Sequence, residues 1–190
     1  MVHTFSTMLP LGVEAPDFQL NDVVSGKIKS LNELKSEVAT VMMFICNHCP
    51  YVRHYNEELA RISNDYMHKR VSFIGISSND ADAFPDDSPE NLKRQAETFG
   101  FKFPYLHDAS QMVAKAYKAA CTPDFFIFDK NLKLVYRGQL DGSRPKNDEP
   151  VTGKDLRTAL DSILKGQPIE ATQIPSSGCN IKWKAGVSPF

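Results

Sequence analysis

The chain has 190 residues, of which 42% are hydrophobic and 24% are charged, and its formal net charge is −1. This balance excludes an intrinsically disordered chain, which lacks the apolar residues that a folded core needs. No apolar run approaches the roughly 18 residues of a membrane-spanning helix, and the charge gives no support to binding of nucleic acid or an anionic membrane. We expect one main domain over residues 1–166 and a tail over residues 167–190.

The first half of the chain alternates strand and helix patterns. In order, we predict a hairpin (18–21 with 27–28), a short helix that Ser30 caps and that ends at Leu34, a buried strand (38–44), a long amphipathic helix from residue 50, a second buried strand (71–77), an acidic loop (78–90) and a helix that Ser88 caps and that ends at Gly100. The apolar face of the long helix consists of residues spaced three and four apart, namely Val52, Tyr55, Leu59, Ile62 and Tyr66.

The second half adds shorter elements. We predict a short strand (104–107), a helix (110–120), two strands (125–128 and 133–136) joined by a tight turn, a polar loop (141–151) and a helix that Thr152 caps and that ends at Leu164. Helices separate the early strands, which should therefore be parallel, whereas the two late strands should be antiparallel. The predicted fold is α/β: a mixed central sheet with helices on both faces, an N-terminal hairpin and a C-terminal extension.

Four cysteines are too few for a disulfide scaffold in a chain of this length. The first 18 residues lack a basic segment followed by a continuous apolar one, because residues 8–11 are few and are interrupted by Pro10. We therefore expect the protein in a reducing compartment, the cytoplasm. In such a compartment, closely spaced cysteines indicate redox chemistry or metal binding rather than a structural disulfide.

The segment CNHCP, residues 46–50, joins a buried strand to the start of the long helix. A helix N-terminus presents N–H groups without intrahelical partners and the positive end of the helix dipole, and both stabilise a thiolate. A protonated His48 would add to this stabilisation. Two buried cysteines that only fill space are the alternative. The order strand, CxxC, helix is nevertheless typical of redox-active cysteines.

The position of Pro50 indicates which cysteine is the nucleophile. Proline fits best at the first helical position, where its missing N–H has no partner to lose. This placement makes Cys49 the N-cap, puts Cys46 in the preceding loop, and predicts that Cys49 is the thiolate directed toward solvent. In the alternative, Cys46 is the cap and Cys49 lies in the first turn, which also tolerates proline.

In these residues the chain resembles the thioredoxin superfamily, and within it the peroxiredoxin-like branch of alkyl hydroperoxide reductases and thiol-specific antioxidants (redoxins). The similarity runs from GVEAPDF at residues 12–18 to about Leu164. It includes the strand–CxxC–helix unit, FPYLHD at residues 103–108 and CTPDFFIFD at residues 121–129. The resemblance implies a thioredoxin-like fold.

The resemblance also implies roles for residues that precede the first late strand. Family members carry a Thr-Pro or Val-Pro pair whose cis-proline packs beside the redox cysteine, and Thr122-Pro123 matches this pair. It implies that Pro123 is cis and that Thr122 and Pro123 position the backbone of a partner. An ordinary trans proline at the start of an edge strand is the alternative. Cys121 is a candidate resolving cysteine, and a buried packing cysteine is the equal alternative.

The chain departs from the family patterns at both cysteines. If Cys49 aligns with the first cysteine of typical thioredoxins, the second falls at Val52, so the disulfide partner must be another cysteine, Cys46 or Cys121. Peroxiredoxins carry Thr or Ser three residues before the peroxidatic cysteine. Here the corresponding residue is Cys46 for Cys49 and Met43 for Cys46, which weakens the prediction of peroxidase activity.

We expect no metal and no organic cofactor. Zinc requires about four ligands, whereas the chain has one CxxC pair, with Cys121 and Cys179 isolated. The acidic residues 80–90 lack the central glycine and terminal glutamate of an EF-hand and are predicted to form a solvated loop. The tail segment SGCNIKWK, residues 177–184, resembles the end of an uncharacterised peroxiredoxin-like subfamily.

Together these features predict a thiol–disulfide oxidoreductase. Cys49, by preference, attacks a disulfide, and a second thiol, for which Cys46 is one candidate, resolves the mixed disulfide. The residues expected to contact substrate are His48, Pro50, Thr122 and Pro123. The expected partners are protein or small-molecule disulfides and thiols and a cellular thiol reductant, with no nucleic acid and no membrane. The alternatives are a peroxide-reducing antioxidant, in which Cys49 forms a sulfenic acid, and a non-catalytic thioredoxin-like binding module.

Overall fold

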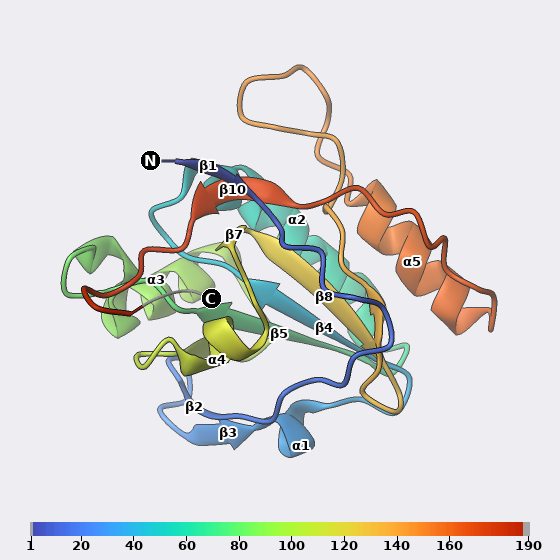
Figure 1. The fold of residues 1–190 in the computed structure, drawn as a ribbon, viewed down its shortest axis with the longest axis horizontal. Helices are drawn as coiled ribbons and strands as arrows, with labels where there is room; N and C mark the ends of the chain where they lie inside the picture. The colour runs from blue at the N-terminus through green and yellow to red at the C-terminus, as the bar shows by residue number, and fades with distance from the viewer. Residues whose placement is uncertain (1, 188–190) are drawn as a thin grey trace.

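The computed structural model describes residues 2–187, which form ten β-strands, five α-helices and one 3₁₀-helix (Figure 1). The strands are β1 (His3–Phe5), β2 (Gln19–Asp22), β3 (Ile28–Ser30), β4 (Ala39–Phe44), β5 (Val71–Ser77), β6 (Tyr105–His107), β7 (Cys121–Thr122), β8 (Asp124–Asp129), β9 (Leu134–Tyr136) and β10 (Ser177–Asn180). The helices are α1 (Leu31–Leu34), α2 (Pro50–Met67), the 3₁₀-helix η1 (Pro85–Asp87), α3 (Pro89–Phe99), α4 (Met112–Ala116) and α5 (Lys154–Leu164). None of the helices in this range is long and apolar enough to cross a membrane.

A seven-stranded sheet forms the centre of the molecule, in the order β3-β2-β6-β5-β4-β8-β9 (Figure 1). Strands β4, β5 and β6 run parallel to one another, and the remaining pairs are antiparallel. This arrangement confirms the predicted mixed sheet, including the N-terminal hairpin β2–β3 and the late hairpin β8–β9. Because β4 and β5 are parallel, the segments that follow them emerge at the same edge of the sheet.

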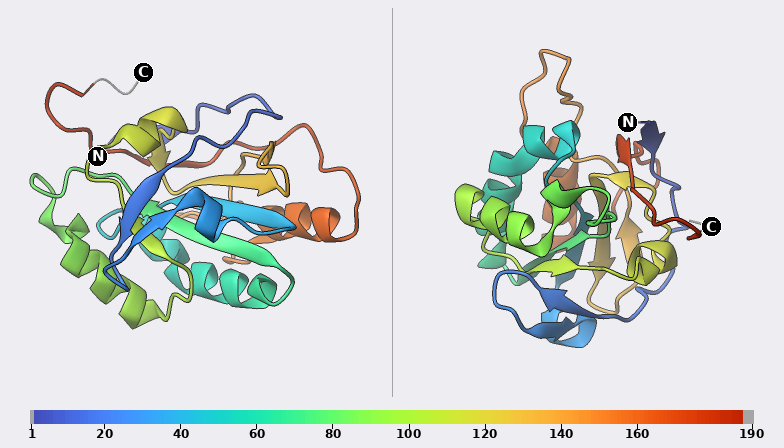
Figure 2. Two further views of the ribbon diagram at one scale, coloured as in Figure 1. Left: turned by 90° about the horizontal axis from the view of Figure 1, so that it is seen from below. Right: turned by 90° about the vertical axis from the view of Figure 1, so that its left-hand side faces the viewer.

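Helices cover both faces of this sheet (Figure 2). Helices α2, α3 and α5 pack on one face, and α1 and α4 pack on the other. Neighbouring residues of β4 divide between the two cores: Val41 and Met43 join the first, whereas Met42 and Phe44 join the second. Successive side chains of a strand point to opposite faces of the sheet. Every residue of β4 is buried, so this strand is covered on both sides.

Two helices differ from their predicted bounds. The helix predicted over residues 110–120 is reduced to α4, because Gln111 and Lys118 adopt left-handed backbone conformations, with φ of 63° and 47°. The N-cap of α5 is Gly153 rather than Thr152. The N–H of Thr152 instead donates to the carboxylate of Asp141 at 2.7 Å. Both differences arise from backbone geometry and distant hydrogen bonds, which hydrophobic periodicity does not report.

A second, three-stranded sheet, β1-β10-β7, joins both ends of the chain to its middle (Figure 1). The predicted tail therefore contains a strand, β10, which pairs antiparallel with β1 and β7 and places Cys179 opposite Thr122. A side-chain carbon on Gly178 would collide with the carbonyl oxygen of Thr122, so the glycine permits this close approach. Residues 188–190 of the predicted tail lie outside the described residues.

We predict that Gly178→Ala displaces β10 from β7 and lowers the free energy of unfolding by about 1–3 kcal/mol, the typical effect of overpacking. Urea unfolding measures the change. The matched control is Ile174→Ala in the same segment, where the side chain is 59% exposed and the change should stay within about 0.5 kcal/mol. Equal stability of Gly178→Ala and wild type would contradict the close packing of β10 on β7.

Candidate active site

Cys46 and Cys49 lie in the loop that leaves β4 and enters α2. Helix α2 begins at Pro50, and Cys49 is its N-cap, with φ −70° and ψ 123°. This confirms the position that Pro50 predicts for Cys49 and leaves Cys46 in the preceding loop. The carbonyl of Cys46 accepts a hydrogen bond from Gln95 Nε2 of α3 at 3.3 Å, which ties this loop to the neighbouring helix.

The sulfur of Cys49 is enclosed by protein groups rather than by solvent. Cys49 and Cys46 are both 0% exposed, so the prediction that Cys49 is directed toward solvent is wrong. The Cys49 thiol donates to the carbonyl oxygen of Thr122 at 3.2 Å, and hydrogen bonds also join it to Cys46 and to Cys179 on β10. The contact with Cys179 comes from the C-terminal tail, which shows no hydrophobic periodicity.

These contacts lower the pKa of Cys49, whereas the pKa values of its two thiol neighbours are raised. Hydrogen bonds from Cys179 and then Cys46 lower the pKa of Cys49, with a further contribution from the backbone N–H of Val52 in the first turn of α2. The backbone N–H of Cys179 adds to this effect, and these donors together outweigh the opposing effect of burial. Burial raises the pKa of Cys46, and the hydrogen bond to Cys49 raises that of Cys179. Cys49 is therefore the thiol of the three that ionises first.

The loop before β8 closes the site from the other side. The peptide bond between Thr122 and Pro123 is cis, the isomer that the resemblance implies. Thr122 Oγ1 lies 3.4 Å from the Cys46 sulfur. Adjacent residues of a strand point to opposite faces, so Cys121 faces away from these thiols. Its sulfur lies 3.5 Å from the carbonyl oxygen of Pro123 and 3.9 Å from that of Ser176, and these contacts give no support to a resolving role.

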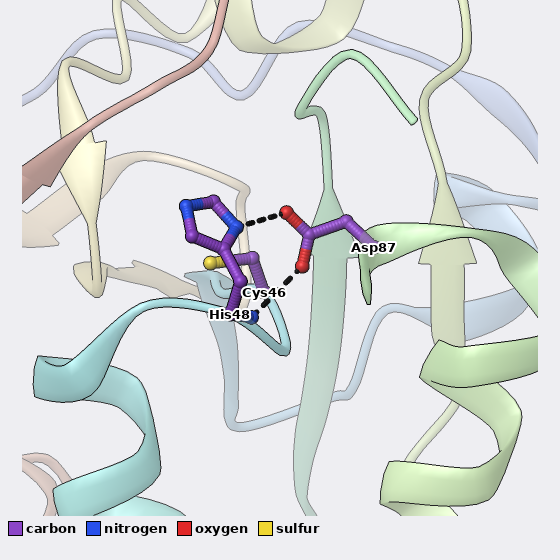
Figure 3. Close-up of side chains that lie close together, drawn as sticks. All are labelled: Cys46, His48 and Asp87. Atoms are coloured by element: carbon purple, nitrogen blue, oxygen red, sulfur yellow. Dashed lines mark hydrogen bonds and ion pairs between the residues drawn. The ribbon is translucent and has the colours of Figure 1, made fainter. Parts of the chain in front are cut away.

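His48 is held by a carboxylate that sequence reasoning missed. Asp87 Oδ2 lies 2.5 Å from His48 Nδ1, and Oδ1 accepts the backbone N–H groups of Asn47 and His48 at 2.7 and 3.0 Å (Figure 3). Asn79 Nδ2 also donates to Oδ2, at 2.8 Å. Asp87 is 0% exposed, so the prediction that residues 80–90 form a solvated loop is wrong at this position.

The network fixes the charge of Asp87 and the direction of the His48 ring. Burial alone would raise the pKa of the Asp87 carboxyl, but the hydrogen bonds from His48, Asn79 and the backbone hold that pKa below its usual value. A carboxylate can only accept, so His48 Nδ1 carries the proton. Its other nitrogen, Nε2, is buried and has no hydrogen-bond partner among residues 2–187. One nitrogen of the His48 ring is therefore held by Asp87, and the other has no partner in the described part of the chain.

The same residues offer the ligand types that metals prefer. The potential ligand atoms of Cys46, His48 and Asp87 lie within 4.8 Å of one another (Figure 3). Both oxygens of Asp87 already accept two hydrogen bonds each. A cation would have to displace the short bond to His48. The donor set therefore suits a hydrogen-bonded network better than a metal centre.

Comparison with known proteins identifies a matching family and several similar proteins. Residues 11–137 match the model of the AhpC/TSA family. The crystal structure of an uncharacterized conserved protein from Geobacillus kaustophilus is 58% identical, with a TM-score of 0.97 over 98% of this chain and 99% of that chain. Thiol-disulfide oxidoreductase ResA from Geobacillus thermodenitrificans is 26% identical over 164 residues, which are 84% of this chain and 82% of that protein.

Solved structures of lower identity establish the fold. A thiol:disulfide interchange protein of the thioredoxin family from Chlorobium tepidum is 19% identical, with a TM-score of 0.62 over 80% of this chain and 97% of that chain. This likeness confirms the predicted thioredoxin-like fold. The cysteine-bearing loop between β4 and α2 and the cis-proline loop before β8 are the two parts of that fold which meet at Cys49.

We predict that Asp87→Ala lowers the free energy of unfolding by about 3 kcal/mol at pH 7, because it leaves four buried or half-buried donors without an acceptor. Urea unfolding measures this. The pKa of Asp87 is lowered in the folded state, so its contribution is fully present above about pH 4 and is lost as the pH falls through the lowered pKa.

The neighbouring Asp86 provides the control for this change. Its side chain is 66% exposed, so Asp86→Ala should alter the free energy of unfolding by no more than about 0.5 kcal/mol. Similar effects of the two substitutions would show that Asp87 does not anchor the loop.

Proposed function

The chain belongs to the AhpC/TSA family, and from this premise we propose that it is a thiol–disulfide oxidoreductase whose nucleophile is Cys49. The observation that carries the proposal is the placement of Cys49 at the N-cap of α2, where two thiols and the first turn of the helix lower its pKa. A buried structural cysteine has the opposite tendency, since burial raises a thiol pKa. The inert binding module is therefore the weaker interpretation.

In the first step, the Cys49 thiolate attacks one sulfur of a substrate disulfide. A bond forms between the Cys49 sulfur and that sulfur, the substrate S–S bond breaks, and the second substrate sulfur leaves as a thiolate that takes up a proton. The peptide groups of Thr122 and Pro123 lie beside Cys49 and are suited to position the backbone of the partner. Pro50, the first residue of α2, adjoins Cys49 and has no backbone N–H, and we propose that its ring contacts the bound partner.

In the second step, Cys46 resolves the mixed disulfide. The Cys46 sulfur attacks the Cys49 sulfur, a Cys46–Cys49 disulfide forms, and the first substrate sulfur leaves. Burial raises the pKa of Cys46, so its proton needs an acceptor at neutral pH. We assign this role to His48, whose ring lies close to Cys46 with Nδ1 held by Asp87, and whose Nε2 has no hydrogen-bond partner among residues 2–187 and is available to take up a proton. A cellular thiol reductant then returns both cysteines to the thiol form.

The proposed setting follows from the same chemistry. A reducing compartment such as the cytoplasm would supply the thiol reductant and favour the dithiol form. The partners are disulfides and thiols, of proteins or small molecules, and neither a nucleic acid nor a membrane takes part. Sulfur carries both electrons of the exchange, so the reaction requires no organic cofactor.

The direct test is reaction of the reduced protein with oxidised glutathione. Release of the first glutathione should fall by about 100-fold in Cys49→Ser, because the attacking thiolate is lost. It should stay near the wild-type rate in Cys46→Ser, since the attack needs only Cys49 and a serine hydroxyl can still donate to it. Cys121→Ser is the matched control and should behave as wild type.

Two outcomes of this test would contradict the proposal. One is unchanged release in Cys49→Ser, which would remove the assigned nucleophile. The other is fast, saturable turnover of hydrogen peroxide that depends on Cys49, which would favour the peroxide-reducing alternative. We expect slow peroxide reduction, because Cys46 stands where peroxiredoxins place a hydroxyl that stabilises the transition state.

The role of His48 has its own test in the second step. We predict that His48→Asn slows formation of the Cys46–Cys49 disulfide by about 100-fold at pH 7, the typical contribution of a positioned base. Raising the pH should restore the rate, because more Cys46 then ionises without help. The control is His54→Asn in α2, where the ring lies 2.7 Å from Ser143 Oγ, and this change should leave the rate unchanged. Equal slowing at every pH would indicate a structural role for His48 instead.

A further inference from the structure

Strand β10 brings a third cysteine to the reactive sulfur. Cys179 lies directly opposite Thr122 in the antiparallel ladder between β10 and β7. Directly opposite residues place their side chains on the same face of a sheet. Cys179 therefore shares the face on which Thr122 contacts Cys46, and its thiol is hydrogen bonded to Cys49. The Cys49 sulfur thus has two thiol neighbours, one from its own loop and one from the far end of the chain.

The backbone of β10 also permits its close approach to Thr122. Gly178 adjoins Cys179, and any side chain there would collide with the carbonyl of Thr122, the group that also accepts from Cys49. On the other edge of β10, Thr4 of β1 pairs with Gly178. The strand is therefore held from both sides, which keeps Cys179 at the sulfur. Cys121, the residue before Thr122, instead directs its sulfur to the carbonyl oxygen of Pro123 rather than to Cys49.

We propose that Cys179 is a third redox-active thiol, which forms a disulfide with Cys49 and thereby joins β10 to the N-terminus of α2. The proposal deepens the proposed function and rests on Cys49 as its nucleophile. Starting from the mixed disulfide of Cys49, the Cys179 sulfur attacks the Cys49 sulfur and the substrate sulfur leaves. The proton of Cys179 passes to that leaving sulfur, so one disulfide is exchanged for another and one substrate thiol is released.

This disulfide has a structural consequence that a Cys46–Cys49 disulfide lacks. In the described structure Cys49 is fully buried, and β10 is one of the segments that cover it. A partner strand that pairs with β7 at the edge now occupied by β10 has to take the place of β10. The Cys49–Cys179 bond holds β10 in that place and keeps the site closed, and its reduction by a thiol frees β10 to give way to a partner.

The test is disulfide mapping after oxidation of the reduced protein with diamide, which accepts two electrons and two protons from a pair of thiols. Unreacted thiols are alkylated in denaturant, and tryptic peptides are identified by mass spectrometry. Cys46 and Cys49 share the peptide 36–53, Cys179 lies in 166–182, and Cys121 lies in 119–130. In Cys46→Ser we expect peptide 36–53 linked to 166–182 as the main disulfide product, with Cys121 alkylated.

The matched variant Cys46→Ser/Cys179→Ser removes both thiol neighbours of Cys49 and should lose the linked product. The wild-type protein, mapped in the same way, provides a measurement that needs no substitution. There we expect the 36–53 to 166–182 product alongside the internal Cys46–Cys49 disulfide. Absence of the linked product from both wild type and Cys46→Ser, with Cys179 fully alkylated, would overturn the proposal.

The two proposals fail in distinguishable ways. Diamide forms disulfides without any substrate, so the linked peptide reports on Cys179 alone. If glutathione release depends on Cys49 but the linked peptide is absent, the third-thiol proposal is wrong and the proposed function stands. If the linked peptide forms but glutathione release is unchanged in Cys49→Ser, the proposed function is wrong, and with it the exchange step assigned to Cys179.

Discussion

The hydrogen bonds that converge on the Cys49 sulfur are the interactions on which the rest of the site depends. They need three separate segments to meet at one atom: the start of α2, the loop before β8 and the C-terminal strand β10. Each donor on its own is weak, because a thiol is a poor hydrogen-bond donor. Together the donors, which are the thiols of Cys46 and Cys179 and the backbone N–H groups of Val52 and Cys179, favour the thiolate of Cys49 over the thiolates of its neighbours, whereas the carbonyl of Thr122 accepts from Cys49 only while it is a thiol.

The same enclosure creates the main constraint on the chemistry. The donors around the Cys49 thiolate stabilise it, but because Cys49 is fully buried they also shield it from any partner. The central sheet and α2 are built into the hydrophobic cores, since residues of β4 are buried in both cores and the apolar face of α2 is buried in one. The small sheet β1-β10-β7 is formed by short strands, of which β1 and β10 come from the two ends of the chain. Strand β10 of this sheet therefore both covers Cys49 and, through Cys179, contributes with Cys46 and the start of α2 to its lowered pKa.

Sequence reasoning succeeded where local patterns determine the geometry. Pro50 at the first helical position defines Cys49 as the N-cap, and the apolar run before Cys46 identifies β4 as a strand buried on both faces of the sheet. It failed where the geometry depends on distant contacts. Asp87 looks solvated in an acidic stretch, and only the turn at η1 directs its carboxylate to the loop of His48. Cys179 lies in a tail without periodicity, because a four-residue strand takes its register from β1 and β7.

The most direct measurement of the central claim is the thiolate absorbance near 240 nm of the reduced protein, titrated against pH and compared with Cys49→Ser. We expect the difference between the two to be one thiolate that persists well below pH 7, while the remaining cysteines ionise only at alkaline pH. A difference titration centred near pH 8.5, the usual thiol value, would contradict the account, because it would mean that neither the helix nor the neighbouring thiols stabilise the Cys49 thiolate.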